Sequence, residues 1–138
     1  PPSDAGGHTN SVTCPVSIDS AVVGGWVCEH RDPYILPMVG FRTYVAGTDQ
    51  NHWWDDGMNA IAFSRGSKGF VAINRESFVV DTTLATGVPA GTYCDLLTGG
   101  LSTGACVGTS LVVDSTGAIH VHLLTNSAVA IDGAAKLP

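Results

Sequence analysis

Short apolar runs separated by glycine-containing turns make up most of this chain. The runs Ala60–Phe63 and Phe70–Ile73 flank the turn Gly66–Gly69, which is the signature of a β-hairpin. A second pair of runs, Leu111–Val113 and Ile119–Leu124, flanks another turn and predicts a second hairpin.

Three further runs, Phe78–Val80, Tyr93–Leu97 and Ala128–Ile131, complete the series. Short strands at this spacing, with turns rich in glycine, are typical of an antiparallel sandwich. The pattern therefore predicts a mainly β protein with about seven to eight strands.

The pattern differs before the first of these strands. Residues 1–30 show no sustained period and are predicted to be loop. Asp32 followed by Pro33 suits a helix start, because Asp is a good N-cap and Pro fits the first turn. Pro37 offers a second start, because proline is excluded from a helix interior. We expect a helix that begins at Pro33 or Pro37 and ends near Ala46.

Leu36, Val39, Gly40 and Tyr44 share one face of this helix. A single amphipathic helix depends on an apolar surface to pack against. The chain opens on Pro1 with no initiator methionine, so we expect it to be cut from a longer protein whose preceding part supplies that surface.

The chain has 138 residues, enough for one domain with an ordinary core. Hydrophobic residues make up 44% and charged residues 13%, which favours a folded globule over a disordered segment. The net charge of −6, without a basic cluster, argues against nucleic acid as a partner. No apolar segment approaches the ~20 residues that span a bilayer, so no membrane partner is expected.

The four cysteines form two close pairs in the sequence, Cys14 with Cys28 and Cys94 with Cys106. There is no Cys-x-x-Cys motif, so zinc or thioredoxin-like chemistry fits poorly. Two disulfides indicate an oxidising, extracellular setting. Four cysteines allow three connectivities, and nearest-neighbour pairing is the one we favour.

Asp55 and Asp56 are the most conspicuous candidate catalysts, because retaining glycosidases use two carboxyl groups ~5 Å apart. Neighbouring residues on an extended strand point to opposite faces, so these two cannot both face one sugar. A turn or strand edge before Gly57 is the favoured interpretation, and no catalytic residue is assigned.

Trp53 and Trp54 are candidate glucan-binding residues, because a flat exposed indole can stack on a pyranose. Alternation along a strand would turn one indole toward the core and the other outward or toward a neighbouring domain. Packing is the commoner fate of such residues, and a surface glucan site is the alternative.

His120 and His122 lie two residues apart, hence on one face of a predicted strand. A metal site would need a third donor, and no neighbouring residue in the sequence supplies one. We therefore assign no metal site. By its residues alone, the chain has no convincing active site.

Three segments of the sequence, Trp26–Arg31, Met38–Arg42 and Asn51–Asn74, together resemble the C-terminal part of secreted α-amylases of the animal type, a group shared by some bacteria. The stretch Thr86–Asp95 continues the likeness, which covers nearly the whole chain. The resemblance implies a parent enzyme built on a (β/α)8 barrel that hydrolyses internal α-1,4 bonds of starch and glycogen with retention.

The resemblance also implies how the chain divides. Residues 1–46 would be the last loop and last helix of the catalytic barrel, and residues 47–138 the Greek-key β-sandwich that follows it. The implied disulfides are Cys14–Cys28 and Cys94–Cys106. Pro37 and Gly40 depart from the family pattern within the expected helix.

The catalytic carboxylates of such enzymes lie upstream of this region, as do their calcium site and any chloride site. The resemblance therefore implies a secreted, non-catalytic C-terminal region, inactive alone and without cofactor, whose partner is the catalytic barrel. The alternatives are an auxiliary starch-binding module that uses Trp53 or Trp54, and a free-standing lectin-like module, which would leave no exposed apolar stripe on the helix.

Overall fold

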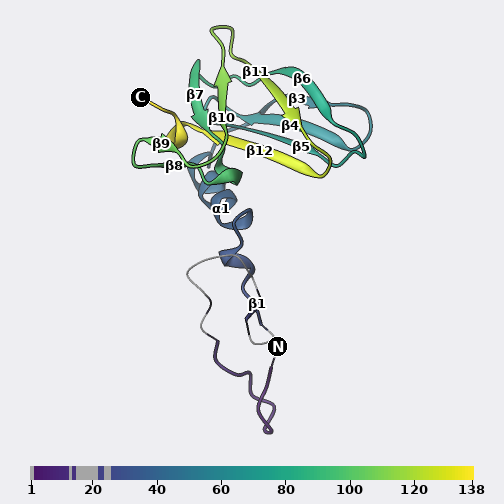
Figure 1. Cartoon of the computed structure of the whole chain (residues 1–138), viewed down its shortest axis with the longest axis vertical. Helices are drawn as coiled ribbons and strands as arrows, with labels where there is room; N and C mark the ends of the chain where they lie inside the picture. Colours follow the sequence, from purple (N-terminus) through teal and green to yellow (C-terminus); the bar gives the residue numbers. More distant parts are fainter. Residues whose placement is uncertain (1, 13, 15–21, 24–25) are drawn as a thin grey trace.

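The computed structural model describes residues 2–12, 14, 22–23 and 26–138. Its main body is a sandwich of two four-stranded antiparallel sheets (Figure 1). The predicted mainly β sandwich is thus confirmed. One sheet has the order β12-β5-β4-β3, with bounds Ser127–Asp132, Gly69–Asn74, Ala60–Arg65 and Gln50–Asp55. The other has the order β6-β11-β10-β7, with bounds Val80–Ala85, Ala118–Leu123, Ser110–Val113 and Gly91–Cys94.

Alternation along each strand builds the core between the sheets. On β11, Ile119, Val121 and Leu123 are buried, whereas His120 and His122 face outward. The inward side chains of both sheets form one cluster with Phe70 and Tyr93 among its largest members. Both predicted hairpins are present, with Arg65 paired to Gly69 in one and Val113 to Ile119 in the other.

A buried polar knot joins the two sheets at one end of the sandwich. Asn74, fully buried at the end of β5, directs its side-chain Nδ2 at the carbonyls of Phe78, Leu123 and Leu124 at 2.9–3.0 Å. Its Oδ1 accepts a hydrogen bond from the Glu76 amide at 2.7 Å. The loops between β5 and β6 and between β11 and β12 are therefore held by one side chain.

Helix α1 (Ile35–Tyr44) packs on the outer face of the sheet that contains β5 and β12 (Figure 1). Phe41 and Val45 are buried there against Val71 and Ala130. The helix begins two residues before Pro37, so that residue occupies the first turn, where its missing N–H is tolerated.

The helix starts at Ile35, between the two expected starts at Pro33 and Pro37, with Tyr34 at the N-cap position, and Asp32 lies in the turn just before it. The Asp32 carboxylate accepts hydrogen bonds from the amides of Tyr34 and Ile35 at 2.8 and 3.3 Å. A short 3-10 turn, η1 (Glu29–Arg31), precedes it. Within the described residues, no helix is both long and apolar enough to cross a membrane.

The N-terminal region is mostly without regular structure in its described parts, as expected. The two-residue strands β1 (Val22–Val23) and β2 (Trp26–Val27) pair with each other. The described N-terminal residues extend away from the sandwich beyond α1 (Figure 1).

Both implied disulfides are present. Cys14 is joined to Cys28, and Cys94 to Cys106, with Cα–Cα distances of 5.9 and 5.1 Å. The second disulfide ties β7 to β9 (Ala105–Cys106), which pairs with β8 (Leu101–Ser102).

Two predicted strands have different bounds in the structure. Leu96 and Leu97 belong to a 3-10 turn, η2 (Leu96–Thr98), because the Asp95 carboxylate accepts a hydrogen bond from the Leu97 amide and turns the chain. The run Phe78–Val80 lies mostly before β6, since Phe78 and Val79 are exposed and pairing starts at Val80. A last 3-10 turn, η3 (Gly133–Ala135), follows β12.

Candidate functional site

A β-bulge in the edge strand β3 decides where the two tryptophans point. The register with β4 shifts between Asn51 and Trp54, and His52 takes a positive φ of 49°. Beyond the bulge, Trp54 pairs with Ala62 and packs on the core between the sheets. Alternation then places Trp53 on the outer face.

Trp53 is held in one orientation on that face. Its ring stacks on Phe63, with ring centroids 6.2 Å apart and an interplanar angle of 15°. Its Nε1 donates a hydrogen bond of 2.7 Å to the Asp55 carboxylate. The side chain is nevertheless 54% exposed, so much of the indole is free to contact something else.

Asp55 and Asp56 are both occupied by local hydrogen bonds. Asp55 accepts from Trp53 and from the Gly57 amide at 3.0 Å. Asp56 lies beyond the end of β3 and accepts from the amides of Met58 and Ala60 at 2.9 and 3.1 Å. The Ala60 amide, followed by that of Met58, holds the pKa of the Asp56 carboxyl below its ordinary value. These contacts form the turn between β3 and β4.

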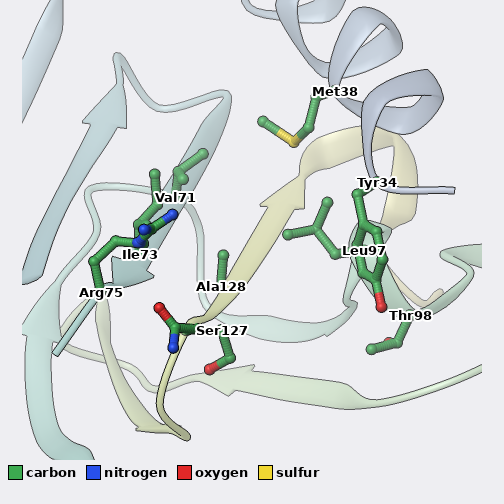
Figure 2. Close-up of a pocket in the computed structure, with 10 residues that line it drawn as sticks. Tyr34, Met38, Val71, Ile73, Arg75, Leu97, Thr98, Ser127 and Ala128 are labelled. Atoms are coloured by element: carbon green, nitrogen blue, oxygen red, sulfur yellow. The ribbon is translucent and has the colours of Figure 1, made fainter. Parts of the chain in front are cut away.

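The outer face of the same sheet carries a groove of about 570 Å³ beside α1 (Figure 2). Four elements of the fold supply its walls: the start of α1, the strands β5 and β12, and the turn η2. Figure 2 shows Tyr34 and Met38 from the helical side, Ile73 from β5 with Arg75 just after that strand, and Leu97 from η2 around the opening.

This groove is mainly apolar and has no carboxylate in its lining. The remaining lining residues are Val71, Thr98, Asn126, Ser127 and Ala128. A glycosidase site needs two carboxyl groups that converge on one bond, so the groove cannot perform that chemistry. An apolar groove of this kind is typical of a surface that binds another molecule or segment.

The side of α1 that faces away from the sheet is also apolar. Leu36 is 50% exposed and Val39 is 59% exposed, and Tyr34 and Ile35 extend the exposed surface at the helix start. Tyr44, the last residue of the stripe expected from the sequence, is 40% exposed but lies next to Gly133, just after β12, and so belongs to the side of α1 that faces the sandwich. A Cβ added at Gly40 would meet no atom within 4 Å, so this residue also borders open space.

Sequence reasoning found the stripe on α1 but missed the groove. Arg75, Leu97 and Ser127 lie far apart along the chain, and no local pattern connects them. Their meeting depends on β12 pairing with β5 and on η2 packing against that sheet.

His120 and His122 lie on one face of β11, as their spacing predicts, and each is near Asp81 on the adjacent strand β6. Within the described part of the chain, no three His, Cys, Asp or Glu side chains form a group that could hold a metal ion.

The chain matches a known family model and several known proteins. Residues 52–133 match the model described as the α-amylase C-terminal all-β domain. An α-amylase from Oryzias latipes is 42% identical over 123 residues, and one from Pecten maximus is 43% identical over 126 residues. These alignments cover 89% and 91% of this chain, and 24% of each relative.

Among solved structures, the wild-type α-amylase I of Eisenia fetida is similar, with a TM-score of 0.80 and 33% identity. The match covers 96% of this chain and 27% of that one. The chain therefore spans about a quarter of the length of the proteins that it resembles.

Proposed function

Because the chain belongs to the family of the α-amylase C-terminal all-β domain, we propose that it is the non-catalytic C-terminal part of a secreted α-amylase and that it packs on the catalytic barrel of that enzyme. The parent would hydrolyse internal α-1,4-glucosidic bonds of starch and glycogen. In this proposal, residues 1–46 end the barrel and residues 47–138 form the sandwich domain.

The exposed apolar stripe on α1 is the observation that carries this proposal. Leu36 and Val39 are at least half exposed on a helix whose opposite side is already packed on the sandwich. Exposed contiguous apolar surface of this kind marks an interaction site. A free-standing lectin-like module is disfavoured, because such a module would leave no unpartnered stripe.

Trp53 extends the same surface across the sheet. Its stacking partner Phe63 belongs to the cluster in which Phe41 of α1 is buried, so the indole lies on the face that carries the helix. A partner that covers α1 can therefore also cover Trp53. The groove next to Tyr34 and Arg75 lies on this face as well and suits insertion of a segment from the barrel.

The disposition of the carboxylates supports the proposed lack of catalysis. Asp55 and Asp56 are engaged by the turn that contains them, and the groove has no carboxylate at all. The two disulfides suit the oxidising conditions outside the cell.

The packing role is tested in the full-length enzyme by Val39→Asp, with Val112→Asp as a matched control. Val39 is 59% exposed on α1, and Val112 is 62% exposed on the outer face of the other sheet. Burial of an unpaired carboxylate in the interface should lower the free energy of unfolding by on the order of 3–5 kcal/mol. Thermal unfolding should show a marked decrease for Val39→Asp alone, and equal midpoints for both variants would refute packing through α1.

The lack of catalysis is tested separately on the purified 138-residue chain. Its intact mass is checked against 14.2 kDa, and soluble starch is then assayed for release of reducing sugar. We expect none, and sustained release by a confirmed 14.2 kDa species would overturn the non-catalytic role.

Glucan binding by Trp53 is the second candidate, favoured by its fixed and half-exposed indole. Electrophoresis through gels with and without soluble starch distinguishes the two roles. If Trp53 only packs on the barrel, the isolated chain migrates equally in both gels. Retardation that Trp53→Ala abolishes, but that Phe78→Ala at another exposed aromatic position preserves, would establish binding instead.

A further inference from the structure

A second groove, of about 420 Å³, lies where α1 meets the end of β12, and the proposed function does not use it. The helix contributes Pro37, Gly40 and Tyr44 to its lining, and residues in and around η2 and η3 contribute most of the rest. All of the lining residues are apolar, glycine or tyrosine except Asp132 at the end of β12. The second groove is therefore an apolar surface with a single carboxylate.

Only one oxygen of that carboxylate is engaged. Asp132 is 4% exposed, and its Oδ1 accepts hydrogen bonds from the amides of Ala134 and Ala135, both at 3.0 Å. Its Oδ2 accepts none from the residues that the structure describes. Among these residues, Arg65 Nε is the one side-chain polar atom that is sealed from solvent without a partner, so Oδ2 still reaches open space. The second groove is the space that Asp132 borders.

No positive charge in the described part of the chain neutralises Asp132. The ion pairs there each join a histidine to another aspartate, and the lining of the second groove contains no lysine or arginine. Lys68 and Lys136 lie instead over tyrosine rings, 6.0 Å from the centre of Tyr44 and 5.7 Å from that of Tyr93. Burial of a carboxylate without a counter-charge is unfavourable, and here burial raises the pKa of the Asp132 carboxyl.

The second groove adjoins the apolar stripe through which α1 is proposed to contact the barrel. Pro37 and Gly40 directly follow Leu36 and Val39, which are 50% and 59% exposed. A Cβ added at Gly40 would meet no atom within 4 Å, so the groove is open on this side. The chain itself has 12 acidic and 6 basic residues, so charge complementarity favours a cation that a partner supplies.

We propose that a lysine or arginine side chain of the catalytic barrel enters the second groove and forms an ion pair with Asp132 Oδ2. The alkyl part of such a side chain suits the apolar lining, and its charged end suits the carboxylate. This inference rests on the proposed function, because it takes the barrel as the partner that covers α1. Removal of one member of a buried ion pair leaves the other charge uncompensated, and this provides the test.

The test is Asp132→Asn, made both in the full-length enzyme and in the 138-residue chain and followed by thermal unfolding at pH 7.5. Asparagine keeps a side-chain oxygen for the two amides but carries no charge. In the 138-residue chain the midpoint should stay equal or rise, because the buried charge has no partner there. In the full-length enzyme the midpoint should fall by at least about 3 °C, because the cation of the barrel loses its partner.

Asp114→Asn is the matched control. The Oδ1 of Asp114 likewise accepts hydrogen bonds from two amides, those of Thr116 and Ala118 at 2.8 and 3.0 Å, but Asp114 is exposed and lies in the hairpin of the other sheet. Its replacement should shift the midpoint by the same amount in both proteins. Circular dichroism at 20 °C verifies that each variant is folded.

Gly40→Leu tests whether the second groove is occupied, independently of charge. In the 138-residue chain the midpoint should rise, because leucine favours a helix more than glycine does and the position borders open space. In the full-length enzyme the midpoint should fall, because the new side chain obstructs the entering one. A rise in both proteins would overturn the proposal.

The proposal is also overturned if Asp132→Asn shifts the midpoints of both proteins alike. That result is expected if Asp132 only caps η3, or if the barrel presents a neutral hydrogen-bond donor to it. Val39→Asp in the full-length enzyme separates this failure from that of the proposed function. If Val39→Asp still lowers the midpoint, α1 packs on the barrel and only the ion pair is refuted, whereas no effect of Val39→Asp refutes the packing and the ion pair together.

Discussion

Replacement of Asn74 by alanine should lower the free energy of unfolding markedly, because this side chain holds the two sheets together at one end of the sandwich. The Asn74 side chain is fully buried and lies where β5 ends and the chain crosses to the other sheet. It donates to carbonyls on two separate loops, those of Phe78 and of Leu123 and Leu124, and accepts from the Glu76 amide. Alanine would remove all of these contacts and leave buried backbone groups without partners.

The size of the effect follows from the number of bonds. The amide group has two hydrogens to share among the three carbonyls, so it makes two hydrogen bonds at any moment and accepts a third. Three buried hydrogen bonds at about 1 kcal/mol each, together with the cavity that remains, give a loss of roughly 3–4 kcal/mol. A domain of this size has a total stability of about 5–15 kcal/mol, so the loss is a large share.

Urea-induced unfolding followed by tryptophan fluorescence measures this loss by linear extrapolation. Asn59→Ala is the control, because Asn59 is exposed and its backbone amide, which bonds Glu76, is unchanged. That variant should stay within about 0.5 kcal/mol of the unmodified chain. A loss below about 1 kcal/mol for Asn74→Ala would show that the knot is not a major support of the sandwich.

Three further changes test other parts of the fold. Burial raises the pKa of the Asp132 carboxyl above its ordinary value of 3.8, although the amides of Ala135 and Ala134 that it caps act in the opposite direction. The folded state therefore binds more protons than the unfolded state, and the free energy of unfolding decreases as the pH rises through the titration of this carboxyl. In urea unfolding, Asp132→Asn should flatten this pH dependence, whereas Asp132→Ala should lose about 1 kcal/mol because it removes the two hydrogen bonds to the capped amides. Gly69→Ala should cost about 1–3 kcal/mol by thermal denaturation, because the new Cβ would lie 2.6 Å from the Phe41 ring, and an unchanged midpoint would contradict this packing of α1. Replacement of both Cys94 and Cys106 by alanine should lower stability by about 3 kcal/mol in urea, since their disulfide closes a loop of 12 residues.

The sequence alone determined the β-sandwich and both hairpins, because period-two alternation and glycine turns are local signals. The Gly66–Gly69 turn and the run Ile119–Leu124 are examples, since each element is encoded within a few neighbouring residues. The disulfide pairs were the favoured choice among three connectivities and were implied by the resemblance, and both are present in the structure.

Other local patterns were misleading where side chains compete with the backbone. Tyr93–Leu97 has the composition of a strand, but the Asp95 carboxylate captures the Leu97 amide and ends the strand at Cys94. Which tryptophan faces the core also depends on a local irregularity, the bulge at His52, which alternation by itself does not reveal.

Contacts between distant segments were decided by the tertiary structure alone. His120 and His122 are visible in the sequence as a pair, but Asp81 joins them only because β6 pairs with β11 in one register. The groove beside α1 likewise exists only once β12 lies next to β5. Alternation along a strand predicts which face of the sheet a residue occupies. The choice of neighbouring strand depends instead on the free energy of packing the whole sandwich, and no short stretch of residues contains that information.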